Sequence, residues 1–420
     1  MPAYRPLYPL EQQIIAQQTA IELWFAEQWN KVSIPFYASV DLRNAGYKLA
    51  PVDTNLFPAG FNNLNPEYGP LYIDAIQSAI AKLPHAVEKI LIVPENHTRN
   101  LPYLENLSTL WQLFDKAGYQ VQFGTIQSDR DVAITIQDVA GTSIQAQPLK
   151  REGNTVSING FTPDLIILNN DLSSGKPEIL ESLQQTVTPH LDMGWSNRLK
   201  STHFEHYRQI TKEFATHIDL DPWLLNPIFR NCGEIDFMQR EGGDCLERNV
   251  AIILEKIQKK YDAYKIPHQP YAIVKADKGT YGLGIMTVSS TSDITTLNRK
   301  QRTRMSKIKE GQKVDTVIIQ EGVYTSETWQ QTKNATEPVV YTIGNKVIGG
   351  FYRSHDMRAA NDNLNMPGMR LSPFPFTMDE IAVANNANND KPCNRFYAYS
   401  VPARLALLAA TKELHSLDQA

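Results

Sequence analysis

A carboxylate and a carboxamide stand two positions apart in the segment YKLAPVDTNLFPAGFNN, residues 47–63. Alternate side chains of a strand share one face, so Asp53 and Asn55 would present oxygens to one side, about 6 to 7 Å apart at their roots. Hard oxygen ligands of this kind suit Mg²⁺. The pair also fits a second hypothesis, an Asx turn that organises the loop before Pro58.

A glycine-rich loop lies between two strand-like runs in VKADKGTYGLGIMTV, residues 274–288. A Walker loop places its lysine after the glycines at a helix start, and a dinucleotide fingerprint also opens a helix, so both fit poorly. Glycines let backbone N–H groups approach phosphate oxygens, and a lysine on the preceding strand supplies a point charge. The pattern predicts a hairpin over ATP, and the alternative is a plain hairpin with a glycine turn.

A second buried strand, VDTVIIQEGVY at 314–324, ends in Gln-Glu-Gly-Val at 320–323. The main-chain groups of this ending suit an adenine edge, with apolar side chains against the ring faces, although a strand followed by a simple turn also explains the pattern. The segment 336–355 predicts a hairpin with its turn at Gly344–Asn345. An asparagine-containing loop follows at 361–370.

The hydrophobic pattern switches repeatedly between the strand and helix periods, which predicts an α/β (mixed α+β) fold. Residues 89–126 predict a strand–helix–strand unit in which Gly118 ends the helix. After Pro270 the chain turns to strands with glycine-rich turns. The other predicted elements are two strands within 34–56, a strand at 163–171, and helices at 11–29, 202–217, 245–263 and 401–417.

The composition is that of an ordinary globular protein of 420 residues, with 41 basic and 45 acidic side chains and a net charge of −4. This balance predicts no general attraction to nucleic acid or anionic membranes, and the basic run 298–309 lacks the interleaved aromatics of a nucleic-acid site. No apolar run reaches the length of a membrane span and the first residues lack a signal-peptide pattern, so we expect a cytoplasmic protein. Cys232, Cys245 and Cys393 lack metal-site or disulfide spacing, which predicts reduced thiols.

Three separated segments together resemble one protein family. They are VDLRNAGYKLAPVDTNLFPAGFNNL (40–64), VKADKGTYGLGIMTV (274–288) and EPVVYTIGNKVIGGFYRSH (337–355). They are similar to the proteobacterial glutamate-cysteine ligases whose nucleotide site is of the ATP-grasp type, and the similarity spans roughly residues 5–371. The resemblance implies ATP- and Mg²⁺-dependent joining of the glutamate γ-carboxylate to cysteine through an acyl phosphate, the first step of glutathione biosynthesis.

The resemblance also implies which residues hold ATP. Lys275 is the first candidate for the phosphates, and Lys278 is the second because a loop lysine is more often solvated. Lys200 resembles the lysine that ATP-grasp ligases place before the glycine hairpin, although an exposed helix lysine is an equal alternative. The remaining predicted ATP contacts are Gly279, Tyr281, Gly282 and Gly284 of the loop, and Gln320, Glu321 and Val323 at the adenine.

The metal-binding element of ATP-grasp ligases is missing from its usual place. These enzymes carry an acid, and about a dozen residues later Glu-x-Asn, near the end of the fold, but nothing like this follows Arg370. Asp41 precedes Asp53-Thr54-Asn55 by twelve positions instead. The resemblance therefore implies a circularly permuted ATP-grasp fold with an N-terminal metal-binding hairpin, in which Asp in place of Glu shortens the reach by one methylene.

The remaining expectations concern substrates, domains and alternatives. Arg353 and Arg370 resemble residues that hold the transferring phosphoryl group or a substrate carboxylate, and Arg43 is a candidate for glutamate, although each also fits a surface or ion-pair role. We expect an N-terminal segment with the hairpin at 1–85, an α/β substrate domain at 86–200, and an ATP-grasp nucleotide region with a C-terminal helix at 201–420.

Two alternative functions stay open. The first is another ATP-grasp carboxylate-amine ligase, such as a dipeptide ligase or a glutathione synthetase-like enzyme. The second is a regulatory protein that binds ATP without turnover, which the retained lysines, acids and arginines disfavour. The expected partners are glutamate, cysteine and ATP, without nucleic acid or membrane, and the sequence does not decide whether the chain forms a homo-oligomer.

Overall fold

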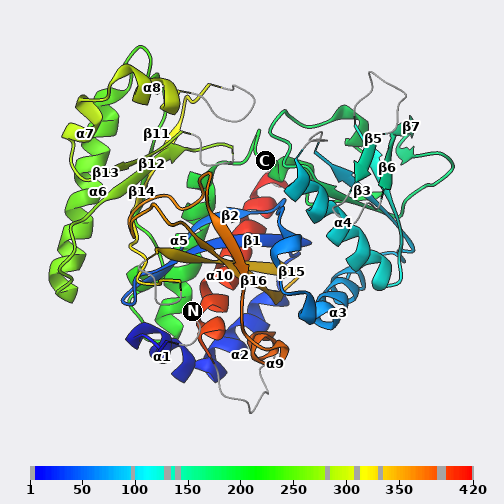
Figure 1. The fold of residues 1–420 in the computed structure, drawn as a ribbon, viewed down its shortest axis with the longest axis horizontal. Coiled ribbons are helices and arrows are strands. Elements are labelled where there is room, and N and C mark those ends of the chain that lie inside the picture. The colour runs from blue at the N-terminus through cyan, green and yellow to red at the C-terminus, as the bar shows by residue number, and fades with distance from the viewer. Residues whose placement is uncertain are drawn as a thin grey trace.

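A computed structural model describes residues 5–95, 100–126, 134–137, 143–279, 284–306, 313–329, 334–385 and 394–418. Three principal β-sheets and a set of long helices make up this part of the chain (Figure 1). The mixed α/β class predicted from the sequence is confirmed.

The central sheet has five antiparallel strands in the order β17-β16-β15-β1-β2. The predicted N-terminal hairpin supplies two of them and the predicted 336–355 hairpin supplies two more. Val40 of the first hairpin pairs with Val340 of the second, so segments far apart in the sequence lie side by side. The bounds are β1 Tyr37–Asn44, β2 Leu49–Asn55, β15 Thr336–Ile343, β16 Lys346–Ser354 and β17 Arg370–Pro373.

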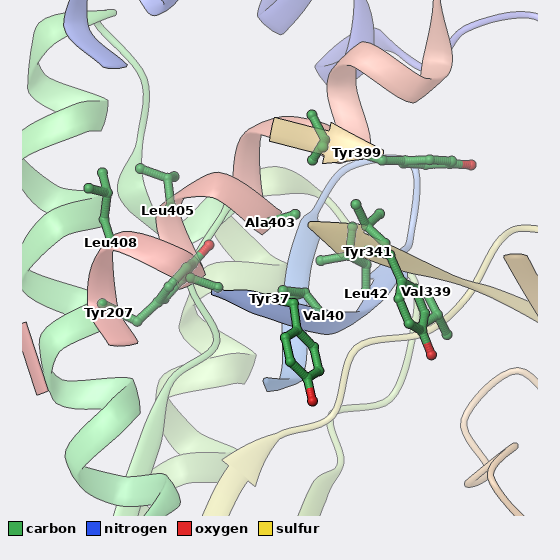
Figure 2. Packing of buried hydrophobic residues seen from close by; sticks show 14 of the residues in the cluster. Tyr37, Val40, Leu42, Tyr207, Val339, Tyr341, Tyr399, Ala403, Leu405 and Leu408 are labelled. Atoms are coloured by element: carbon green, nitrogen blue, oxygen red, sulfur yellow. The ribbon is translucent and has the colours of Figure 1, made fainter. Parts of the chain in front are cut away.

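The long helices α5 (Lys200–His217) and α10 (Arg395–Asp418) pack against each other, and α10 also packs against the first hairpin. Nearly every described side chain of α10 from Phe396 to Ala410 is buried, as expected for a helix that is covered on all sides. Figure 2 shows the resulting core, in which side chains of β1, β15, α5 and α10 come together. It labels Tyr37, Val40, Leu42, Tyr207, Val339, Tyr341, Tyr399, Ala403, Leu405 and Leu408.

The second sheet has six strands in the order β10-β9-β3-β4-β6-β5, and all neighbours are parallel except β5 and β6. The predicted strand–helix–strand unit is confirmed, since α4 (Leu101–Lys116) joins β3 to β4 and Gly118 follows it with φ +99°. The strands are β3 Lys89–Pro94, β4 Gln120–Thr125, β5 Ile134–Gln137, β6 Ser143–Pro148, β9 Leu165–Asn169 and β10 Thr186–Thr188, and a separate hairpin is formed by β7 Lys150–Glu152 and β8 Thr155–Ser157.

The third sheet has four antiparallel strands in the order β11-β14-β12-β13 and is packed against α6 (Gly243–Tyr264). The expected strand–glycine loop–strand arrangement is confirmed at its edge, where Lys275 of β12 pairs with Ile285 of β13. The strands are β11 Phe229–Cys232, β12 Ala272–Ala276, β13 Ile285–Val288 and β14 Val317–Glu321. Two predicted ATP contacts in the loop, Tyr281 and Gly282, lie outside the described residues.

Several helices complete the structure. The single helix predicted at 11–29 is wrong in detail, because the chain breaks at Gln17 into α1 and α2. No helix among the described residues is long and apolar enough to cross a membrane. The bounds are α1 Pro9–Ala16, α2 Gln18–Trp29, α3 Gly69–Ile80, α7 Ser292–Thr295, α8 Arg299–Met305 and α9 Met378–Ala382.

Candidate active site

A cavity lies where the four-stranded sheet, the first hairpin of the five-stranded sheet and the loop after β16 meet. It gathers residues from segments that are up to about three hundred positions apart in the chain. The predicted site residues that line it are Asp41, Arg43, Asp53, Lys200, Lys275, Lys278, Gly279, Gln320, Glu321, Val323 and Arg353.

Two buried lysines enter the cavity from different elements. Lys275 is held by β12, and its Nζ donates a hydrogen bond of 2.6 Å to the carbonyl oxygen of Val52 on the facing hairpin. Burial lowers the pKa of Lys275 to about 8, and the neighbouring Lys200 acts in the same direction, while Asp53 opposes the shift. Lys200 is the first residue of α5, and its Nζ lies 3.7 Å from the centre of the Trp195 ring. The cavity therefore has a strongly cationic wall.

Asp53 faces these lysines from β2. Its Oδ1 accepts a hydrogen bond of 3.0 Å from Nζ of Lys200, which also lies 3.3 Å from Oδ2. Burial alone would raise the pKa of Asp53, but the charges of Lys200 and Lys275 outweigh burial and hold the pKa well below its usual range. Asp53 is consequently ionised at neutral pH.

A chain of buried charges continues from Asp41 across the floor of the cavity. Nη1 of Arg353 lies 2.7 Å from Oδ2 of Asp41 and 2.7 Å from Oε1 of Glu337. The other oxygen of Glu337 accepts a hydrogen bond of 2.6 Å from Nε of Arg43. Burial raises the pKa of Asp41 despite the opposing charge of Arg353. Burial alone would lower the pKa of Arg353, but the charges of Asp41 and Glu337 outweigh burial and raise the pKa, so the guanidinium stays charged.

Arg43 also fixes the loop after β16. Its Nη1 and Nη2 donate hydrogen bonds to the carbonyl oxygens of Ala360 (2.8 Å) and Asp362 (2.6 Å). This contact places an asparagine-rich stretch against the cavity. The stretch contributes Asn361, Asp362, Asn363 and Asn365 to the cavity wall.

The end of β14 forms another part of the cavity wall. Gln320 is 2% exposed, and its Nε2 has no hydrogen-bond partner within the described chain. The hydroxyl of Tyr271 donates to the carbonyl oxygen of Val323 at 2.8 Å. A Cβ on Gly322 would lie 2.1 Å from the Tyr271 ring, so the close approach requires glycine there. This wall combines apolar side chains with one unpaired amide.

The carboxylate of Glu321 has a structural role in the same strand. Its oxygens accept hydrogen bonds from Nζ of Lys48 (3.0 Å), Nε1 of Trp223 (3.0 Å) and the backbone N–H of Ile228 (2.8 Å). These partners satisfy the buried charge. The carboxylate of Glu321 is therefore unavailable to a ligand, and its backbone N–H already donates to the carbonyl oxygen of Ile228 at 2.7 Å, so its contact with adenine stays a prediction.

Three other predicted site residues do not line the cavity. Arg370 is exposed and pairs with Asp356. Oδ1 of Asn55 accepts a hydrogen bond of 2.9 Å from the backbone N–H of Phe57, which is the Asx-turn alternative of the sequence analysis. The carbonyl oxygen of Gly284 accepts a hydrogen bond from the N–H of Ala276. Catalytic, metal-binding and ATP-binding roles for these residues stay predictions.

Mg²⁺ requires hard oxygen ligands, and two carboxylates of the cavity are candidates. Asp41 and Asp53 are direct cross-strand partners in the register of β1 and β2, and both reach the cavity. Each is paired with a cation, Arg353 and Lys200 respectively. Within the described ranges there is no group of three or more His, Cys, Asp or Glu side chains arranged to hold a metal. Two carboxylates are fewer ligands than Mg²⁺ takes, so a bound ion would need further oxygens from a ligand or from water.

A buried cluster next to the strand that carries Asp53 was not predicted from the sequence. Nη1 of Arg198 donates to the carbonyl oxygen of Thr54 at 2.6 Å, and its Nε lies 2.7 Å from Oε2 of Glu413 on α10. Nδ1 of His203 lies 2.7 Å from Oε1 of the same carboxylate. Glu337 was missed as well. Glu413 belongs to no motif, and Glu337 opens the segment 337–355 without a spacing that marks it, so only the tertiary contacts reveal the roles of these two acids.

Comparisons with known proteins give one strong family match. The glutamate-cysteine ligase family (GshA) matches residues 11–414. A crystal structure from Methylobacillus flagellatus assigned as a gamma-glutamylcysteine synthetase is 45% identical, with a TM-score of 0.87, over 99% of this chain and 98% of that chain. No curated protein matches the chain.

Two further solved structures are much more distant. D-alanyl-alanine synthetase A from Vibrio cholerae has a TM-score of 0.35 and 10% identity, over 76% of this chain and 82% of that chain. A glutathione synthetase-like effector from Globodera pallida has a TM-score of 0.36 and 11% identity, over 83% of this chain and 76% of that chain. Neither likeness is strong enough to bear on the fold.

Proposed function

We propose, from the premise that the chain belongs to the glutamate-cysteine ligase family, that its cavity binds ATP and Mg²⁺ and joins the γ-carboxylate of glutamate to cysteine through an acyl phosphate. The observation that carries the proposal is the meeting of Lys200, Lys275, Asp41 and Asp53 in one cavity. Glutamate, cysteine and ATP would be its small-molecule partners in the cytoplasm.

A carboxylate resists attack by an amine, so it must first be activated. ATP supplies the phosphoryl group that converts the γ-carboxylate into an acyl phosphate, from which the amine of cysteine displaces phosphate. Phosphoryl transfer depends mainly on positioning and on neutralisation of charge. The protein therefore needs cations around the transferring group and needs no nucleophile of its own.

The two buried lysines are the side chains that we assign to the phosphates. Lys200 and Lys275 are each less than 8% exposed, and charges in such surroundings interact more strongly than they do in water. Lys278 and the N–H of Gly279 stand next to them on the cavity wall. In this proposal Tyr281, Gly282 and Gly284 complete the loop over the phosphates.

The carboxylates of β1 and β2 are the residues that we assign to Mg²⁺. The ion, when bound, supplies neutralisation of phosphate charge. Asp41 and Asp53 would hold the ion. Asp41 would then give up its ion pair with Arg353, and Asp53 would give up its ion pair with Lys200. Asn55 could join them only by giving up its hydrogen bond to Phe57.

The arginines divide into two roles. Nε of Arg353 is buried and has no hydrogen-bond partner in the described structure, so part of this guanidinium is free for the transferring phosphoryl group. Nε, Nη1 and Nη2 of Arg43 all donate to protein oxygens. We therefore propose that Arg43 positions the loop at 360–362, and that its predicted contact with glutamate is secondary. Arg370 stays a prediction without geometric support.

The arrangement of sheets supports a permuted ATP-grasp architecture. The first hairpin carries the acids and pairs with β15, so an N-terminal element completes a sheet built from C-terminal strands. A nucleotide would lie between this sheet and the four-stranded sheet, with its adenine at Gln320 to Val323. We also propose that residues 86–200 form a substrate domain and residues 201–420 form the nucleotide region.

Amino-acid-dependent release of ADP tests the function. With Mg²⁺ and ATP, glutamate plus cysteine should stimulate ADP release and yield the γ-linked dipeptide, whereas either amino acid alone should not yield it. A binding protein without turnover would bind ATP and release no ADP in response to amino acids. A preference for another acid or amine in the same assay would point instead to a different carboxylate-amine ligase.

Replacement of Asp53 tests the site. Asp53→Asn removes the charge at nearly constant shape, and kcat should fall by about 10²- to 10³-fold. Asp74→Asn is the matched control, since Asp74 is an exposed acid paired with Lys346 outside the cavity. Circular dichroism should show both variants folded. Wild-type turnover in Asp53→Asn would remove this residue from the mechanism.

A further inference from the structure

Two cysteines that the proposed reaction does not use touch each other in the nucleotide region. Cys232 is the last residue of β11, and Cys245 lies in the first turn of α6. Their sulfur atoms are 3.0 Å apart, and both thiols are free. A disulfide bond has a sulfur–sulfur distance of about 2.05 Å. The two sulfurs are therefore within about 1 Å of bonding distance.

A third side chain holds the pair in place. Nδ2 of Asn249, one turn along α6 from Cys245, lies 2.9 Å from the sulfur of Cys232 and 3.3 Å from that of Cys245. The Oδ1 of Asn249 accepts a hydrogen bond from Nε of Arg230 on β11. The contact between the two thiols is therefore part of a fixed junction between a strand and a helix.

We propose that Cys232 and Cys245 are a reversible redox-modification site that forms an intrachain disulfide in exchange with low-molecular-weight disulfides. The thiolate of Cys245 attacks one sulfur of the reagent, which forms a mixed disulfide and releases the first small thiolate. The sulfur of Cys232 then loses its proton to solvent and attacks the sulfur of Cys245, which releases the second. Two electrons pass from the protein thiols to the reagent.

The burial of the two residues sets the order of these steps. Cys245 is only partly buried and is the thiol that a reagent can reach, whereas Cys232 is 3% exposed. Burial and the neighbouring Cys245 raise the pKa of Cys232 to about 12, so Cys232 stays protonated beside the free Cys245 and is not the first thiol to attack. Cys232 is accordingly the resolving residue.

The position of the pair predicts the effect of oxidation. The bond would close the loop 233–244 and join β11 to α6, and β11 pairs with β14, which carries the adenine wall. Neither cysteine lines the cavity. Oxidation should therefore stabilise the nucleotide region, raising Tm by about 5 °C, and should leave the ATP site intact.

Thiol mapping tests the proposal independently of the ligase reaction. The protein carries Cys393→Ser, so that only the pair can react, and is incubated folded with oxidised glutathione. Mass spectrometry of peptides should show a Cys232–Cys245 link with loss of both free thiols, and dithiothreitol should restore them. A protein that keeps both thiols, or forms the link only in denaturant, would overturn the proposal.

Single variants test the order of attack. Cys232→Ser should accumulate a stable mixed disulfide at Cys245, since no resolving thiol remains. Cys245→Ser should leave Cys232 unmodified while the protein is folded, and neither variant should show the rise in Tm on oxidation. Modification of Cys232 in folded Cys245→Ser would contradict the proposed order, and a Tm rise in either variant would show that the pair is not its source.

Discussion

Lys275 shows how the surroundings of one residue set a pH dependence. Burial lowers the pKa of its ammonium group to about 8, so the free protein loses this cation as pH rises through that value. A phosphate ligand favours the charged form. The loss should therefore appear in kcat/KM for ATP, which reports the free enzyme, more than in kcat at saturation.

The substitution Lys275→Arg tests this expectation. Arginine stays charged at all accessible pH values, so the variant should lose the fall of kcat/KM above about pH 8, although its activity at pH 7 should be lower than that of the wild type. The measurement is a pH profile of kcat/KM for ATP from pH 6.5 to 9.5. An unchanged fall in the variant would assign the titration to another group.

Glu327 is a second buried group with a shifted pKa, and it lies outside the cavity. Its Oε1 accepts hydrogen bonds from Nδ2 of Asn44 (2.9 Å) and from the hydroxyl of Tyr399, while Oε2 has no partner within the described residues. Burial raises the pKa of this carboxyl to about 7, although Tyr399 and Arg395 oppose the shift. A large share of Glu327 is thus protonated at neutral pH.

The sign of the resulting stability change follows from linkage. Below pH 4.5 the carboxyl is protonated in both states, and between about 4.5 and 7 only the folded protein keeps the proton, so the free energy of unfolding falls by about 3 kcal/mol as pH rises. Glu327→Gln removes this slope. Urea unfolding at pH 5 and pH 8 should show a smaller loss in the variant than in the wild type. Equal losses would contradict the assignment.

Site residues that belong to a spaced motif could be predicted from the sequence. Asp41, Asp53 and Lys275 were found because strand spacing and a glycine loop mark them. Glu337 was not found, since an isolated acid in an apolar strand has no spacing to recognise. The Asx turn of Asn55 was an open alternative. The metal-ligand and Asx-turn hypotheses for this residue differ in the orientation of its side chain, which the sequence does not fix.

At the scale of elements, α10 has a role that its sequence does not reveal. Its apolar surface predicted a helix, but its buried charges form ion pairs with partners far away in the chain. Arg395 pairs with Glu11, Arg404 with Glu22, and Glu413 with Arg198. The helix is therefore fixed at three points along its length, and the last of them adjoins the strand that carries Asp53.

Glu413→Gln tests the last of these points. The change leaves the buried guanidinium of Arg198 without its counter-charge, so the free energy of unfolding should fall by about 3 kcal/mol at pH 7. Lys412→Ala is the control, because the side chain of Lys412 is 40% exposed and its Nζ lies 3.9 Å from Oε1 of Glu213. Urea unfolding measures both variants. If Lys412→Ala lost as much free energy of unfolding as Glu413→Gln, the loss would reflect a general sensitivity of this end of α10 to substitution.

The same carboxyl predicts an acid dependence. Burial alone would raise the pKa of Glu413, but Arg198 and His203 outweigh burial and lower the pKa to about 2. Its contribution to stability is present above the unfolded pKa and is lost as pH falls from about 4.5 towards 2. The acid-unfolding curve of Glu413→Gln should accordingly be shallower than that of the wild type over this range.

Other elements show which parts of the fold the hydrophobic pattern can predict and which it cannot. Long segments with a clear period, such as α4 to α6, were predicted, whereas β7, β8 and β10 have three residues each and are too short to show alternation. The break at Gln17 has no glycine or proline to mark it.

At the scale of the whole molecule, one ligand is expected to bridge two sheets. The cavity takes Lys275 and Gln320 from the four-stranded sheet, and Asp41, Asp53 and Arg353 from the five-stranded sheet. A non-hydrolysable ATP analogue with Mg²⁺ at one hundred times its Kd should raise the free energy of unfolding by about 2.7 kcal/mol.

A thermal melt with and without the analogue measures this effect. Asp53→Asn should show a smaller rise in Tm, and Asp74→Asn should show the full rise. Mg²⁺ without nucleotide should give little stabilisation, because the carboxylates are already paired with protein cations. No shift with the analogue in the wild type would contradict nucleotide binding in this cavity.

The pairing of Val40 with Val340 also has a consequence for synthesis of the chain. At about 5 to 20 residues per second, the ribosome needs roughly 15 to 60 s to make the intervening segment. During that time one edge of β1 has no partner, and an open strand edge is a site of aggregation. The nascent polypeptide should therefore need shielding of this edge, by its own early helices or by a chaperone, until the segment that carries β15 has been made.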